Sequence, residues 1–172
     1  MKRFNIQALP ELLPFIKDSD ERGYFSSPFG RSAISKLDSS QVYIALSFTN
    51  LAYTIRGMHF QSQPFSESKL LKVISGSILD VVISLDDSLP LSERIHKFNL
   101  SEKDEVCLYI PKGYAHGYQT LTDNVLLMYA LDSEFSKPHT RGFSPMSPPL
   151  ATIWPAKPTY IKPEDLLWAQ LN

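Results

Sequence analysis

Residues 69–85, KLLKVISGSILDVVISL, give the clearest indication of the fold class. This stretch contains two apolar runs, 69–75 and 77–85, with Gly76 between them. Short runs rich in β-branched residues are typical of β-strands. The second run includes Ile78-Leu79-Asp80-Val81-Val82-Ile83 and is almost continuously apolar, as in strands that are covered on both faces. The stretch therefore predicts two buried strands joined by a turn.

Similar β-rich runs continue on both sides of this stretch, separated by many of the 13 prolines and seven glycines. Further strands are expected over 42–48, 53–61, 105–110, 117–120, 125–131 and 150–153. Helices are expected only over 31–37 and over 163–170, where a proline and first-turn acids favour a helix start. The sequence thus predicts a mainly β sandwich or barrel, such as a jelly roll, with short helices near both ends.

The length of 172 residues, without an internal repeat or a shift in composition, predicts a single domain over 1–172. Six prolines between 136 and 158 predict an ordered loop with one short strand near Ile153. With 17 basic and 18 acidic side chains, the chain has no charge excess for bulk nucleic-acid binding. A few arginines could still bind phosphate locally.

The single cysteine, Cys107, lies among apolar residues and is expected to be a buried, unreactive thiol. A chain with one cysteine forms no intrachain disulfide, which fits a reducing compartment. No apolar run has the length of a signal-peptide core or a membrane span. We therefore expect a cytoplasmic protein with no membrane association.

Two histidines, His59 and His116, lie on or beside strands that are expected to line a barrel. Such a histidine is either a hydrogen-bonded structural residue or a catalyst, and the strand alone does not decide between them. Arg56 and Lys69 lie nearby in the sequence and favour an anionic ligand with an ionisable centre.

Strict alternation along 53–61 places His59 on the face of Ile55 and Gly57, with Arg56 on the opposite face. Both side chains can reach one ligand only if Gly57 supports a bulge or a twist. If Arg56 and His59 bind the same ligand, the sequence therefore predicts a bulge or a twist at Gly57.

Three further residues have both a functional and a simpler interpretation. Asp80 interrupts an apolar run, so it either pairs with Lys69 or a histidine, or lies at an edge open to water. Tyr129 is the only side chain of 125–131 with a proton to give, yet aromatic residues are common in β cores. Asp165 fits the acidic first turn of a helix.

Several motifs together resemble one enzyme family. They occur in the order Asp20-Glu21-Arg22-Gly23-Tyr24-Phe25, Arg56-Gly57-Met58-His59-Phe60-Gln61, Lys69-Leu70, Gly76 with Asp80-Val81, Pro111-Lys112-Gly113-Tyr114-Ala115-His116-Gly117, and Trp154-Pro155. Over about 20–165, the chain resembles the dTDP-4-dehydrorhamnose 3,5-epimerase family.

The resemblance implies a cupin-type jelly roll that acts without a metal or another cofactor. It also implies a homodimer, in which an N-terminal segment of about residues 1–50 contributes to the dimer and the nucleotide site. The implied substrate is a nucleotide-diphosphate-linked 4-keto-6-deoxyhexose, epimerised at C3, C5 or both.

By position, the resemblance gives His59 the role of general base and Asp165 that of its carboxylate partner. Tyr129 matches the general acid, and Lys69 matches the lysine near the C4 oxygen of the sugar. The remaining matches are expected to contact the substrate or its nucleotide: Arg22, Phe25, Arg56, Gln61, Asp80, His116 and Phe135.

The chain departs from the family pattern at three places. Phe135 stands where many members have a second active-site tyrosine, which removes one hydroxyl from the pocket. The residues 44–48 lack the family's Gln-x-Asn-x-Ser pattern, and Ser27 stands near an expected glutamate. These departures leave open the nucleotide, the sugar and the number of inverted carbons.

Two other functions are compatible with these residues. Pro111-x-Gly113-x-x-His116 also resembles a motif of metal-dependent cupin oxygenases and isomerases, although His59-Phe60-Gln61, followed later by Glu67, is an incomplete ligand set. A sugar-nucleotide binder that has lost catalysis would tolerate the three departures. It would have no need to keep His59, Asp165, Tyr129 and Lys69 together.

Overall fold

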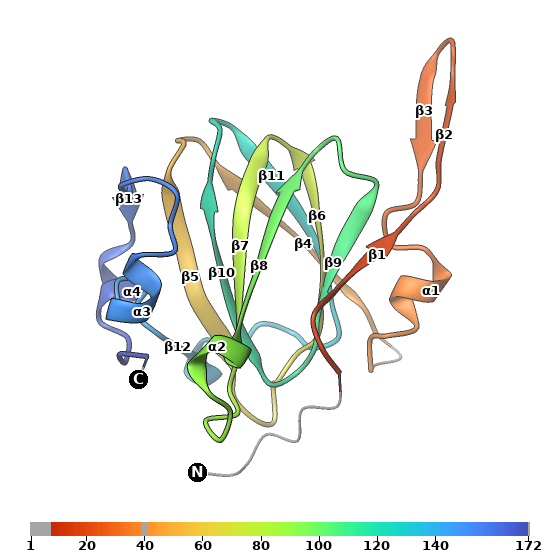
Figure 1. The fold of residues 1–172 in the computed structure, drawn as a ribbon. Coiled ribbons are helices and arrows are strands. Elements are labelled where there is room, and N and C mark those ends of the chain that lie inside the picture. Colours follow the sequence, from red (N-terminus) through yellow and green to blue (C-terminus); the bar gives the residue numbers. More distant parts are fainter. Residues whose placement is uncertain (1–7, 39–40, 172) are drawn as a thin grey trace.

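Two mainly antiparallel sheets packed face to face form the body of the protein (Figure 1). The structure is a computed structural model that describes residues 8–38 and 41–171. One sheet has the order β1 (Glu11–Pro14), β9 (Val106–Ile110), β6 (Lys69–Ser75), β11 (Val125–Leu131) and β4 (Tyr43–Thr49). The other has the order β12 (Thr140–Gly142), β5 (Thr54–Gln61), β10 (Tyr114–Thr120), β7 (Ser77–Ser84) and β8 (Ile95–Ser101), with β13 (Tyr160–Ile161) beside β5.

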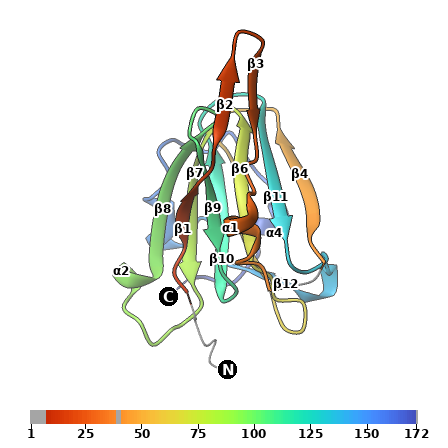
Figure 2. The same ribbon diagram turned by 90° about the vertical axis from the view of Figure 1, so that its right-hand side faces the viewer.

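The remaining elements are short. They are the hairpin of β2 (Lys17–Asp20) and β3 (Gly23–Ser26), the helices α1 (Arg31–Ile34), α2 (Leu91–Arg94), α3 (Pro148–Ala151) and α4 (Pro163–Leu166), and one 3-10 turn, η1 (Lys137–His139). The β2–β3 hairpin extends away from the two sheets in both views (Figures 1 and 2). No helix in the described part of the chain is long and apolar enough to cross a membrane.

The stretch 69–85 forms the two expected strands, β6 and β7, but they do not pair with each other. Gly76 carries the chain from one sheet to the other with a φ of +82°, a conformation that favours glycine. A Cβ at Gly76 would lie 2.6 Å from the Thr122 hydroxyl oxygen. This passage between two facing sheets, repeated along the chain, produces the jelly roll of cupin type that was expected.

The core consists of three apolar layers. The layer between the sheets includes Leu71, Val82 and Leu127. The C-terminal segment packs Leu150 and Trp154 against the outside of the six-stranded sheet, and α1 covers the outside of the other sheet. Strands covered on both faces explain why the apolar run in β7 is nearly continuous.

The structure corrects several expected elements. Residues 150–153 were expected as a strand, but Pro148 and Pro149 start the short helix α3 there. The helix expected over 163–170 ends at Leu166. The strand β8 was not expected, because this edge strand alternates partly buried and exposed residues and carries several polar side chains. The strands β1, β2, β3, β12 and β13 were also not expected, and each has no more than four residues.

Candidate active site

A bulge in β5 brings two candidate residues to the same face of the sheet. His59 pairs with His116, and Arg56 pairs with Tyr118, so three steps along β5 match two along β10. The extra residue turns Arg56 and His59 toward the space between the sheets. The bulge expected at Gly57 is confirmed. Strict alternation is wrong, because Ile55 packs in the outer layer.

Two glycines allow the backbones of β5 and β10 to approach closely at the bulge. Gly57 has a φ of +132°, which a side chain would strain. A Cβ on Gly117 would lie 2.8 Å from the Arg56 carbonyl oxygen and 2.9 Å from the Gly57 Cα. The close approach of the two backbones therefore requires glycine on both strands.

His59 is bonded to a carboxylate from the C-terminal helix α4. Its Nε2 lies 2.7 Å from Asp165 Oδ1. The Asp165 side chain is nearly buried, whereas 38% of the His59 side chain is exposed. The Trp168 ring meets the imidazole edge-on at 6.3 Å. Asp165 and Trp168 therefore fix the orientation of the His59 ring, while part of the ring remains accessible to solvent.

A second histidine–carboxylate pair lies next to the first. His116 Nδ1 is 3.2 Å from Asp80 Oδ2, and both residues are buried. Burial raises the pKa of Asp80, although His116 and Lys69 oppose this. Burial also lowers the pKa of His116. Asp80 thus has the histidine partner that its position in an apolar strand required, while its Oδ1 has no partner among the described residues.

Tyr129 points from β11 into the same space. Its ring centroid lies 6.1 Å from that of His116. Burial raises the pKa of Tyr129 well above its usual value, and the nearby Tyr118 and Asp80 add to this. The Tyr129 hydroxyl therefore keeps its proton at neutral pH.

Lys69, at the start of β6, forms an ion pair with Glu67. Its Nζ lies 3.0 Å from Glu67 Oε1, and both side chains are almost buried. The other Glu67 oxygen accepts a hydrogen bond from Gln61 Nε2 at 3.1 Å. Gln61 is itself 5% exposed and bonded to protein groups, and its role as a substrate contact stays a prediction.

Arg56 and Tyr118 face the edge strand β4. Arg56 Nη1 donates to the Phe48 carbonyl at 3.2 Å. The Tyr118 hydroxyl lies 2.9 Å from the Ser47 hydroxyl and 3.3 Å from that of Thr49. Tyr118 was not expected in the site, although it follows His116 by two residues and therefore shares its face.

Three expected residues lie apart from this group. Arg22 and Phe25 are on the protruding β2–β3 hairpin, where Arg22 binds Asp20 and 75% of Phe25 is exposed (Figure 1). Phe135 is 73% exposed in the loop after β11. Within this single chain, the hairpin does not complete the group formed by His59, Asp165, His116, Asp80, Lys69 and Tyr129.

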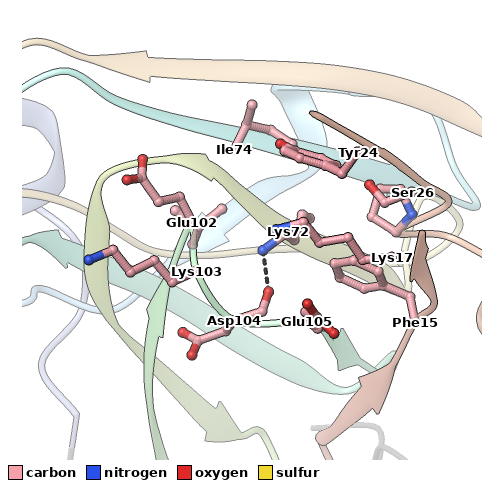
Figure 3. A pocket seen from close by; sticks show the side chains of 12 residues that line it. Phe15, Lys17, Tyr24, Ser26, Lys72, Ile74, Glu102, Lys103, Asp104 and Glu105 are labelled. Atoms are coloured by element: carbon pink, nitrogen blue, oxygen red, sulfur yellow. Dashed lines mark hydrogen bonds between the residues drawn. The ribbon is translucent and has the colours of Figure 1, made fainter. Parts of the chain in front are cut away.

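A separate hollow lies beneath the hairpin (Figure 3). Phe15, Lys17, Tyr24 and Lys72 are among the residues that line it. Lys72 Nζ donates to the Asp104 carbonyl at 2.6 Å, and burial lowers the pKa of Lys72. The lining of this hollow includes none of the expected site residues.

Metal-ligating side chains are dispersed in the part of the chain that the structure describes. Across residues 8–38 and 41–171, no three His, Cys, Asp or Glu side chains gather as a metal site requires. The two imidazoles His59 and His116 are each bonded to a carboxylate.

Comparisons with known proteins identify the family of this chain. The family model for dTDP-4-dehydrorhamnose 3,5-epimerase matches residues 9–172. The enzyme of that name from Sinorhizobium fredii is 31% identical over 150 residues, which cover 86% of this chain and 77% of that protein.

Solved structures show the same fold. The dTDP-4-dehydrorhamnose 3,5-epimerase from Bacillus anthracis, solved with TDP and PPi bound, is 30% identical with a TM-score of 0.85 over 94% of both chains. The Sulfolobus tokodaii protein of the same name is also 30% identical, with a TM-score of 0.81 over 97% of this chain and 93% of that one.

Proposed function

This chain belongs to the dTDP-4-dehydrorhamnose 3,5-epimerase family and is an isomerase of a nucleotide-linked sugar, and we propose that His59 and Asp165 start its reaction. The substrate is a nucleotide-diphosphate-linked 4-keto-6-deoxyhexose, inverted at C3, C5 or both through an enolate. The observation that supports this most is the 2.7 Å bond from Asp165 to a histidine that remains partly open.

The pair defines which nitrogen takes the proton. An ionised Asp165 can only accept a hydrogen bond, so the Nε2 of His59 carries a hydrogen and Nδ1 has the free lone pair. The C4 ketone acidifies the hydrogens on C3 and C5. His59 removes one of them, and Asp165 stabilises the imidazolium that forms.

Lys69 and Tyr129 serve the later part of the reaction. Negative charge collects on O4 of the enolate, and the nearly buried Lys69 ammonium stabilises it there. Tyr129, whose pKa is raised by burial, keeps a proton to return to the opposite face of the ring.

Arg56 anchors the diphosphate, because its planar guanidinium matches phosphate oxygens. Arg22 and Phe25 bind the nucleotide from the neighbouring subunit of a homodimer. Two observations support the homodimer: the hairpin extends away from its own chain, and the outward side chains of β4 are exposed and apolar, namely Ile44, Leu46 and Phe48. The buried Cys107 fits a location in the reducing cytoplasm.

The test is incubation with a dTDP-linked 4-keto-6-deoxyhexose in deuterated water. We expect deuterium at C3 or C5 by NMR, and a panel of CDP, GDP and UDP analogues then identifies the nucleotide. His59→Ala should abolish the exchange while the fold is retained by circular dichroism. Wild-type protein that binds the sugar nucleotide without exchange would instead be a binder. Stoichiometric iron, manganese or zinc by elemental analysis would favour a metal cupin.

A further inference from the structure

We infer that Glu67 is the positioning residue for Lys69. Gln61 holds the Glu67 carboxylate, and Glu67 in turn keeps the Lys69 ammonium where O4 of the substrate develops negative charge. The inference rests on the proposed function, because it assigns Lys69 to the enolate oxygen. From the sequence, Glu67 was expected only as part of an incomplete metal-ligand set.

The geometry gives Glu67 two different partners. Its Oε1 lies 3.0 Å from Lys69 Nζ, and its Oε2 accepts from Gln61 Nε2 at 3.1 Å. About nine-tenths of both the lysine and glutamate side chains is buried. A carboxylate held at both oxygens has little freedom to rotate, so it fixes the ammonium that it binds.

The Gln61 side chain is held in place because its amide also forms hydrogen bonds with the loop after β11. Its Nε2 also lies 3.1 Å from the carbonyl oxygen of Phe65 and 3.0 Å from that of Glu134, so its two hydrogens are shared among three acceptors. Its Oε1 accepts from the Ser136 backbone N–H at 2.6 Å. The loop that carries Phe135 and the cation in the site are therefore tied to one side chain.

Lys69 needs this restraint because it also interacts with a second carboxyl group. Asp80 is fully buried, and Lys69 is one of the groups that oppose the rise in the pKa of Asp80 caused by burial. Asp80 Oδ1 has no partner among the described residues. A lysine on a flexible four-carbon stem would turn toward that oxygen if Glu67 lost its charge. Glu67 thus keeps the ammonium available to the substrate.

The experiment is a double-mutant cycle with Glu67→Gln and Lys69→Met, read as kcat, KM and deuterium exchange. Glutamine keeps the shape of residue 67 and removes its charge. We expect Glu67→Gln to lower kcat about tenfold with KM within about twofold, because the ground-state contacts remain. In the Lys69→Met background, Glu67→Gln should have no further effect. Glu67→Asp should recover part of the loss.

NMR of the Lys69 ammonium group provides a readout that does not depend on turnover. A fixed ammonium gives a resolved ¹H–¹⁵N signal, assigned by its absence in Lys69→Met, and Glu67→Gln should shift or broaden it. Glu11→Gln is the matched control, since Glu11 forms an ion pair with Lys36 on the outer side of the five-stranded sheet, away from the space between the sheets, and should leave kcat and the signal unchanged.

Three results would overturn the inference. They are wild-type kcat in Glu67→Gln, an equal loss in both backgrounds of the cycle, or an unchanged Lys69 signal. Failure of the proposed function is a different result, since wild-type protein would then show no exchange at all.

Discussion

The site contains two histidine–aspartate pairs that differ in their exposure to solvent. His59 and Asp165 lie where substrate can reach the imidazole, whereas His116 and Asp80 are enclosed. Because burial lowers the pKa of His116, that ring is neutral at pH 7 and offers one donor and one acceptor. A group that must gain a full charge during turnover is better placed at the more open position, which favours His59 as the base.

The role of Asp165 can be tested without changing the shape of the site. Asp165→Asn keeps a hydrogen-bonding group near His59 Nε2 but removes the charge that stabilises the imidazolium. We expect kcat to fall by a factor of about 10² to 10⁴, with a small change in KM. Steady-state kinetics and deuterium exchange measure both quantities.

Glu164→Gln is the control for this variant, because the neighbouring carboxylate is exposed and outside the site. Its kcat should equal that of the wild type. Equal activity in Asp165→Asn and the wild type would show that His59 acts without its carboxylate partner.

Cys107 gives a second prediction at this scale. Burial raises the pKa of its thiol to about 11. The reactive thiolate is therefore about 10²-fold scarcer at pH 8 than for a thiol with a pKa near 9.0. We expect native protein to react with Ellman's reagent at least about 10²-fold more slowly than protein unfolded in guanidinium chloride. Similar rates in both states would contradict a buried thiol.

The sequence predicted some of these residues and not their pairings. An aspartate in an apolar strand is either paired or open to water, and the sequence left both interpretations of Asp80 open. Asp165 lies 106 residues from His59, and no local pattern connects them. Only the family resemblance named that pair. The Glu67–Lys69 contact has short sequence spacing, but its strength depends on burial that the sequence does not show.

At the element scale, the bulge in β5 shows what alternation can and cannot predict. A period of two places Arg56 and His59 on opposite faces, and only the demand for one shared ligand suggested an irregularity at Gly57. The long strands β6, β7 and β11 were predicted closely because they are covered on both faces. The edge strand β8 was missed, because His96, Lys97 and Asn99 interrupt its apolar residues.

Replacing Gly57 by alanine should damage both stability and activity. The residue has a φ of +132°, and its new Cβ would overlap the Gly117 backbone. We expect a loss of about 3 kcal/mol or more, or on the order of 10 °C in Tm, by thermal unfolding. Exchange activity should fall as well, since Arg56 and His59 are placed by the bulge.

Gly30→Ala is the matched control, because a Cβ there meets only the Ser27 carbonyl oxygen at 3.7 Å. Its Tm should stay within about 2 °C of the wild type. A Gly57→Ala protein with wild-type Tm would mean that the two strands can separate at little cost.

At the scale of the whole molecule, one chain has two incomplete features. The group between the sheets lacks Arg22 and Phe25, and the hairpin that carries them has few contacts with its own chain (Figure 2). The edge strand β4 exposes Leu46 and its apolar neighbours. A twofold dimer would cover the apolar face and place each hairpin at the partner's site. The departure from the family pattern at 44–48 thus lies on the surface proposed for the dimer.

Mixing two inactive variants tests this arrangement. Arg22→Ala and His59→Ala should each have low activity as pure proteins. In a mixed dimer, the subunit with intact His59 receives an intact hairpin from its partner, so one of the two sites is complete. Random exchange of subunits should therefore restore about a quarter of wild-type activity. Mixing His59→Ala with Asp165→Asn should restore none, because those two residues pair within one chain. A first mixture no more active than its components would show that the hairpin does not serve the partner's site.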